Sequence, residues 1–181
     1  MTVASALTLN SPPSAGFDEP FGMLVACHER VQRMLALLSR LADHLPAQGP
    51  DGPARQAAAD VMRYFDRAAP AHHEDEERHV FPRLRAAGGA AAALADELHE
   101  EHTRMAAAWQ ALRADLLGIA AGALPADGTG GWRARWQAFD RLYRGHIERE
   151  EAAAYPAARA LLPAAELTAT GAEMARRRGV R

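Results

Sequence analysis

Four long segments carry apolar residues at intervals of three and four, the spacing that aligns them along one face of an α-helix. These segments cover about residues 18–45, 54–87, 91–121 and 131–162. Stretches rich in proline and glycine separate them, including PAQGPDGP at 46–53 and GALPADGTGG at 122–131, and such stretches end helices. No segment shows the alternation typical of a strand. The pattern predicts an all-α protein folded as an up-down-up-down four-helix bundle.

The two ends of the chain have a different character from the bundle region. Residues 1–17 are rich in serine and proline without helical period, so we expect a flexible lead-in before a bundle over 18–162. A short tail helix over 163–181 ends in several arginines, which we expect to be solvated. Inside the second helical segment, Pro70 lacks a backbone donor and should kink or split the helix.

Composition narrows the classes of function. The 181 residues carry a formal net charge of -2, which does not favour nucleic acid or an anionic membrane as a partner. Cys27 is the single cysteine, so an intrachain disulfide framework is excluded. No apolar run approaches the ~20 residues needed to span a bilayer, and the N-terminus lacks a secretory pattern. We expect a cytoplasmic monomer or homodimer.

Each predicted helix carries polar residues on its otherwise apolar face. They are His28 in the first helix, His72/His73 with Glu76/Glu77 in the second, His102 in the third, and His146 with Glu150 in the fourth. Burying a lone polar group costs ~1–3 kcal/mol, and a domain has only about 5–15 kcal/mol of total stability. A bound metal would remove this cost, because it makes these groups ligands of one site.

The spacing within two of the helices supports a metal site. His73 and Glu77 are four residues apart, as are His146 and Glu150, so each pair shares one helix face. His72 with Glu76 has the same spacing and remains an alternative. Two such pairs suit two metals, because each carboxylate can bridge while the other helices add one histidine each. Imidazole and carboxylate together suit iron, manganese or zinc better than calcium.

Two stretches resemble the signatures of a known family. HHEDEERHVFP at 72–82 and HIEREEAAAYP at 146–156 are similar to the histidine/glutamate signatures of hemerythrin-like (HHE cation-binding) domains, which end in an aromatic–proline pair. ACHERV and ELHEEHTRM resemble the family's other two histidine helices, and the likeness covers about 20–162. The distance to Phe81-Pro82 fits the family better with His73 and Glu77, so we prefer that register.

The resemblance implies a non-haem di-iron centre with an oxo or hydroxo bridge, in which manganese or zinc could replace iron. The implied ligands are His28, His73, Glu77, His102, His146 and Glu150. Each iron would keep a position for O₂, NO or peroxide. The implied function is to bind, sense or reduce these molecules in oxidative or nitrosative stress or in repair of iron centres. The alternative is iron storage or donation without turnover.

The chain departs from oxygen-carrying hemerythrins in two places. Those proteins have two histidines four apart on the third helix, whereas His99 and His102 are three apart here. On the fourth helix they have an aspartate five residues after the histidine, where this chain has Glu151. His99 and Glu151 therefore remain open as further ligands, and reversible oxygen carriage is not expected.

Overall fold

The computed structural model describes residues 16–125 and 130–180, and every element within these ranges is helical. The elements are α1 (Pro20–Gln48), α2 (Gly52–Phe65), α3 (Ala68–His79), α4 (Phe81–Ala87), α5 (Gly89–Ala120), α6 (Gly131–Arg149), the π-helical turn η1 (Glu150–Ala154), α7 (Tyr155–Ala160) and α8 (Ala164–Arg177). The predicted all-α class is confirmed. Most of the predicted lead-in over 1–17 and part of the loop over 122–131 lie outside the described residues.

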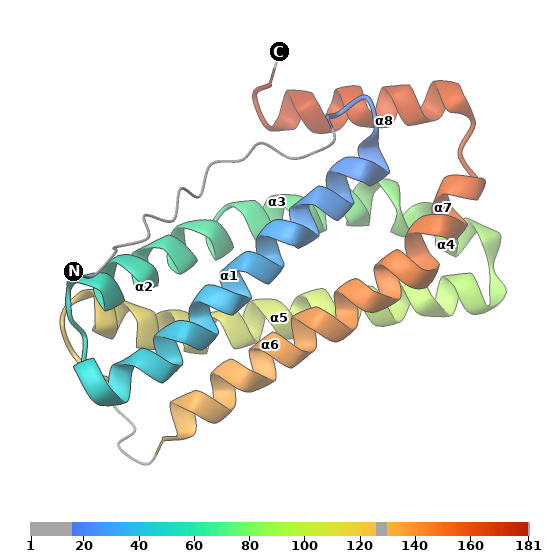
Figure 1. Cartoon of the computed structure of the whole chain (residues 1–181). Coiled ribbons are helices and arrows are strands. Elements are labelled where there is room, and N and C mark those ends of the chain that lie inside the picture. Colours follow the sequence, from blue (N-terminus) through green and yellow to red (C-terminus); the bar gives the residue numbers. More distant parts are fainter. Residues whose placement is uncertain (1–15, 126–129, 181) are drawn as a thin grey trace.

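The elements form four long arms of a bundle, as Figure 1 shows: α1, the chain of α2 to α4, α5, and α6 with η1 and α7. α1 packs against α2 and α6, and α5 also packs against α2 and α6, which gives a closed ring of neighbouring arms. This arrangement confirms the predicted four-helix bundle. Among the described residues, no helix is both long and apolar enough to cross a membrane.

The second arm is split where its sequence contains a proline. α2 ends at Phe65 and α3 begins at Ala68, two residues before Pro70. A proline ring clashes with the carbonyl four residues earlier, here that of Asp66, and provides no hydrogen-bond donor. The predicted break is therefore confirmed, and its position follows from that clash.

Both histidine/glutamate arms are also irregular just before an aromatic–proline pair. In the second arm, α3 ends at His79 and α4 begins at Phe81. In the fourth arm, the backbone N–H of Tyr155 donates to the carbonyl of Glu150, five residues earlier, which is the bond of a π-turn. Such turns insert a residue into a helix and are frequent at functional sites.

The tail helix α8 packs on α1 and crosses one end of the bundle (Figure 1). Arg177 and Arg178 form ion pairs with Asp75, whose side chain is fully buried on α3. The expectation of solvated arginines is wrong for these two. A buried carboxylate needs opposite charge nearby, and the fold rather than the local sequence brings these cations to it.

A layer of polar residues separates the apolar core into two clusters. The larger cluster includes Val31, Phe65 and Met105, and the smaller one includes Leu24, Phe81 and Leu98. On α1 and α5, one histidine lies between a residue of the smaller cluster and a residue of the larger one. The fold thus holds a polar centre between two water-excluding regions.

Candidate metal centre

Six buried side chains from all four arms form the polar centre. They are His28 on α1, His72 and Glu76 on α3, His102 on α5, His146 on α6, and Glu150 at the start of η1. Their exposed fractions do not exceed 5%. Their ligand atoms fall into two groups, each with atoms within 4.8 Å of one another: His28, His72, Glu76 and Glu150, and Glu76, His102, His146 and Glu150.

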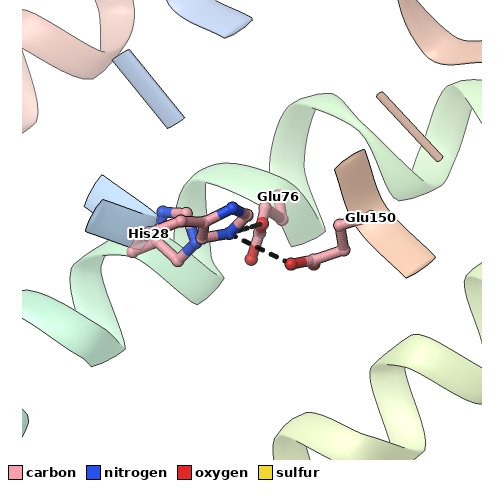
Figure 2. Close-up of side chains that lie close together, drawn as sticks. His28, Glu76 and Glu150 are labelled. Atoms are coloured by element: carbon pink, nitrogen blue, oxygen red, sulfur yellow. Dashed lines mark ion pairs between the residues drawn. The ribbon is translucent and has the colours of Figure 1, made fainter. Parts of the chain in front are cut away.

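In the first group, two imidazoles face two carboxylates. His28 Nε2 lies 3.2 Å from Glu150 Oε2 and 4.0 Å from Glu76 Oε1. Figure 2 shows His28 pointing toward both carboxylates from a different arm. His72 Nε2 lies 3.2 Å from the same Glu76 Oε1. Two imidazole nitrogens and two carboxylate oxygens thus converge on one point.

The second group uses the remaining oxygen of each carboxylate. His102 Nε2 lies 3.4 Å from Glu76 Oε2, and His146 Nε2 lies 2.9 Å from Glu150 Oε1. The two Nε2 atoms are 3.0 Å apart. Glu76 and Glu150 therefore each direct one oxygen to each group, which is the arrangement of a carboxylate that bridges two cations.

The donor set has unsatisfied atoms that a cation would satisfy. Among the described residues, Glu76 Oε2 and both carboxylate oxygens of Glu150 are buried without a hydrogen bond. Burial, then the charge of Glu76, raises the pKa of Glu150 to about 8. Burial lowers the pKa of His28 and of His146, which favours the neutral imidazole that a metal requires. The residues fit a pair of metal ions.

Glu76 and His72 behave as an ion pair in the same centre. Burial alone would raise the pKa of Glu76, but the charges of the nearby His72 and His102 imidazoles hold it well below its usual range. Burial alone would lower the pKa of His72, but the charge of Glu76 raises it well above the usual value. A cation between them would replace the proton on His72 as the partner of this carboxylate.

Four of the six predicted ligands lie in these groups: His28, His102, His146 and Glu150. The structure does not place His73 and Glu77 with them. The Glu77 side chain is 38% exposed, and the His73 ring stacks on the outer side of His102 with ring centroids 3.9 Å apart. The alternative register, His72 with Glu76, lies in the centre, and it is the pair that we propose as ligands.

Helical spacing explains why His72 and Glu76 point inward. Ala69, His72, Glu76 and Val80 are three, four and four residues apart, and all four are buried. Residues at such intervals share one helix face. Ala69 and Val80 belong to the two apolar clusters, so the residues between them on that face must occupy the layer between the clusters.

An internal repeat in the sequence also favours His72 and Glu76 over His73 and Glu77. His28 and His102 are 74 residues apart, as are His72 and His146, Glu76 and Glu150, and the pairs Phe81-Pro82 and Tyr155-Pro156. The spacing from His73 to His146 is 73 residues, so the preferred register broke this repeat. Aligning the chain with itself would have selected His72 and Glu76.

Carboxylates contact the outer nitrogen of three of the histidines. Nδ1 of His28 lies 2.8 Å from Glu151, Nδ1 of His102 lies 2.8 Å from Glu77, and Nδ1 of His146 lies 2.9 Å from Glu101. A hydrogen bond donated from Nδ1 fixes the ring and leaves Nε2 free for a metal. The structure therefore gives Glu77 and Glu151 the role of orienting histidines, and His99 lies outside the buried groups.

The surroundings of His72 are different. Its Nδ1 is buried without a hydrogen bond of standard geometry among the described residues. From α1, the His28 ring meets the His72 ring edge to face with centroids 4.8 Å apart, and Cys27 also interacts with it. The Cys27 thiol lies 3.6 Å from Met23 Sδ. The Tyr155 hydroxyl donates to Glu76 in the same region and lies 3.1 Å from His28 Nε2.

Comparison with known proteins agrees with this centre. A family model described as Hemerythrin HHE cation binding domain matches residues 19–166. An uncharacterized protein of Haemophilus influenzae (strain ATCC 51907 / DSM 11121 / KW20 / Rd) is 37% identical over 102 residues. The match covers 56% of this chain and 59% of that relative. The chain belongs to the hemerythrin HHE cation-binding family, and its buried histidine/glutamate groups are consistent with the dimetal site of such domains.

Proposed function

We propose that this protein holds two non-haem iron ions in the buried centre and uses them to bind, sense or reduce O₂, NO or peroxide. The observation that supports the proposal is the sharing of Glu76 and Glu150 between two histidine pairs. Iron suits this mixture of imidazole and carboxylate, and manganese or zinc could occupy it as well. When bound, iron would supply an electron source and a position for a small ligand.

The protein's own residues prepare this position in three ways. The apolar clusters on either side exclude water from the six ligands, all of which are buried. The outer carboxylates Glu77, Glu101 and Glu151 hold three imidazoles in fixed orientations. The Tyr155 hydroxyl lies between Glu76 and His28 and can donate a hydrogen bond within the dry centre.

Metal analysis of the full-length chain tests the proposal. After anaerobic loading with ferrous iron and removal of excess, we expect about two irons per chain, as for dinuclear bundle sites. His146→Ala should lose most of this iron. His44→Ala is the matched control, because His44 contacts Asp51 outside the centre and its loss should leave the iron content unchanged. Equal iron in both variants would contradict the proposed site.

The ligand is tested on the loaded protein. Changes in the visible absorption on separate addition of air, NO and peroxide should identify which molecule reaches the iron. Consumption of NO or peroxide over many equivalents would support turnover. A loaded protein that consumes none of these molecules, yet transfers its iron to an apo-acceptor, would instead support storage or donation.

A further inference from the structure

A second set of metal-binding side chains lies outside the buried centre. A surface pocket is lined by Pro70, His73, Glu74, Glu77, His99, His102, Thr103 and Ala106. Within it, Nδ1 of His102 and Nδ1 of His99 lie 2.8 Å and 3.5 Å from Glu77 Oε1. The ligand atoms of these three residues lie within 4.8 Å of one another. Two imidazoles and a carboxylate thus meet at the surface.

The outer group is accessible, unlike the buried centre. The side chains of His99 and Glu77 are 49% and 38% exposed, whereas that of His102 is 5% exposed. His73 lines the same pocket one helical turn before Glu77, and its ring nitrogens make no hydrogen bond or ion pair with any described residue. A cation from solution can reach this group without any rearrangement of the bundle.

A single imidazole ring separates the outer group from the buried centre. His102 presents Nδ1 to Glu77 in the pocket and Nε2 to Glu76 and His146 in the centre. An ion held at the pocket is therefore one ring away from the buried ligands. An ion could bind there transiently before it enters the centre.

The charge of the pocket also favours a cation. Its lining contains two glutamates and no lysine or arginine. Glu74 is already paired with Arg78 and Arg177. Glu77 forms ion pairs with histidines alone among the described residues, so its charge is available to an incoming ion.

The internal repeat shows that these histidines are additional to the centre. Positions 74 residues away from His99 and His73 are Val25 and Ile147, although Glu77 matches Glu151. The apolar Val25 is 37% exposed. Both halves therefore keep the glutamate that orients an inner histidine. His99 and His73 have no histidine counterpart in the other half, so the need to orient His102 does not explain them.

We propose that Glu77 and His99, beside His102 and with His73 lining the same pocket, form an outer binding site for a divalent transition-metal ion, which supplies ions to the buried centre past His102. The delivery of ions rests on the proposed function, because it needs a metal centre to receive them. Binding at the outer site can be measured separately. Electrostatic attraction into a charged cleft raises association rates by about 10-fold or more. The outer site should therefore control how fast metal arrives, with little effect on how much is finally held.

Cobalt(II) titration of the full-length apoprotein tests the outer site directly. We expect one weak, rapidly exchanging class of Co²⁺ binding beyond the tightly held ions. His99→Ala should remove this weak class, and Val25→Ala, the matched change in the other half, should retain it. Because Val25 and Glu151 are the repeat positions of His99 and Glu77, Val25→His should bring an imidazole near Glu151 and create a second weak class. Weak binding of equal strength in the wild type and His99→Ala would overturn the inference.

The rate of loading gives the second readout. In stopped-flow absorption at Co²⁺ below saturation, His99→Ala should slow uptake by about 10-fold, with an unchanged final content of tightly held metal. Uptake at the wild-type rate would overturn the role in supply. A wild-type chain that holds no metal tightly would refute the proposed function instead, and the weak class in the titration would still decide the outer site.

Discussion

The two halves of the bundle have the same inner ligands but different outer surroundings. Residues 20–87 and 89–160 each provide one lone histidine and one histidine–glutamate pair to the centre. Around them, Cys27 occupies the repeat position of Glu101, and Phe81 that of Tyr155. The inner residues match, as a shared pair of cations would require the same donors from both sides. The outer residues would not contact that shared pair, so they can differ.

These differences would make the two proposed metal positions unequal. The position near His102 and His146 has a carboxylate behind each imidazole, at 2.8 and 2.9 Å. The position near His28 and His72 has one such carboxylate, a thiol near His72, and the Tyr155 hydroxyl close to His28. Carboxylates behind an imidazole raise its basicity as a ligand. We expect the position near His102 and His146 to bind its ion more tightly than the position near His28 and His72.

The largest effect should come from removing the glutamate of each candidate register in turn, Glu76 and Glu77. Glu76→Ala removes a carboxylate that faces both histidine pairs, so we expect neither metal position to remain occupied. Glu77→Ala leaves the inner carboxylates in place and removes only the orienting contact to His102 from the centre, besides a group of the proposed outer site, so affinity for the tightly held metal should fall by about 10–100-fold. Metal content and affinity measured on both variants distinguish the registers. An empty Glu77→Ala variant beside a loaded Glu76→Ala variant would restore His73 and Glu77 as the ligand pair.

Removal of metal should have the next largest effect, on stability. Without a cation, buried carboxylate oxygens of Glu76 and Glu150 would have no partner among the described residues. A ligand present at 100 times its Kd stabilises the folded state by about 2.7 kcal/mol. Thermal unfolding with and without a chelator should show a lower Tm for the stripped protein. Identical Tm values for a chain that holds metal before stripping would show that the ions contribute nothing to folding.

Tyr155→Phe makes the two halves alike at one outer position, because Phe81 is its counterpart. The change removes a buried hydrogen bond to Glu76, which should cost about 1–3 kcal/mol in the free energy of unfolding. Urea unfolding of the apoprotein measures this cost. The reverse change, Phe81→Tyr, is unsuitable because it would bury a hydroxyl at a fully buried position. Phe139→Leu, in the larger cluster, is the control for a change in core packing away from the centre. A fully stable Tyr155→Phe variant would show that the hydrogen bond is not formed.

The smallest effect on metal affinity should come from changing Glu101 or Cys27, the residues that occupy the same repeat position in the two halves. Glu101→Gln weakens the support of His146 and should reduce affinity for one ion by about 10-fold. Cys27→Ser retains a small polar group near His72 and should change affinity by less than that. Competition with a chromophoric chelator can resolve both. A larger loss for Cys27→Ser would reverse the proposed order of the two positions.

Much of the fold could be read from local patterns. Apolar spacing and breaker stretches predicted the four arms, and Pro70 predicted the split between α2 and α3. Histidines on apolar faces predicted a polar centre, and His28, His102, His146 and Glu150 all reach it. Each of these inferences rests on one residue and its neighbours along a helix, which is information that the sequence contains.

The sequence by itself thus determined the helices, the family and the presence of a buried histidine/glutamate centre. The tertiary structure placed His72 rather than His73 in the buried centre. The sequence left this open because adjacent residues on a helix differ by about 100°, and an apolar stripe is itself at least that wide. The tertiary structure also decided that Arg177 and Arg178 reach Asp75, and that Glu77 and His99 meet at the surface. Those contacts join residues from different helices, so only the packing of the helices brings them together.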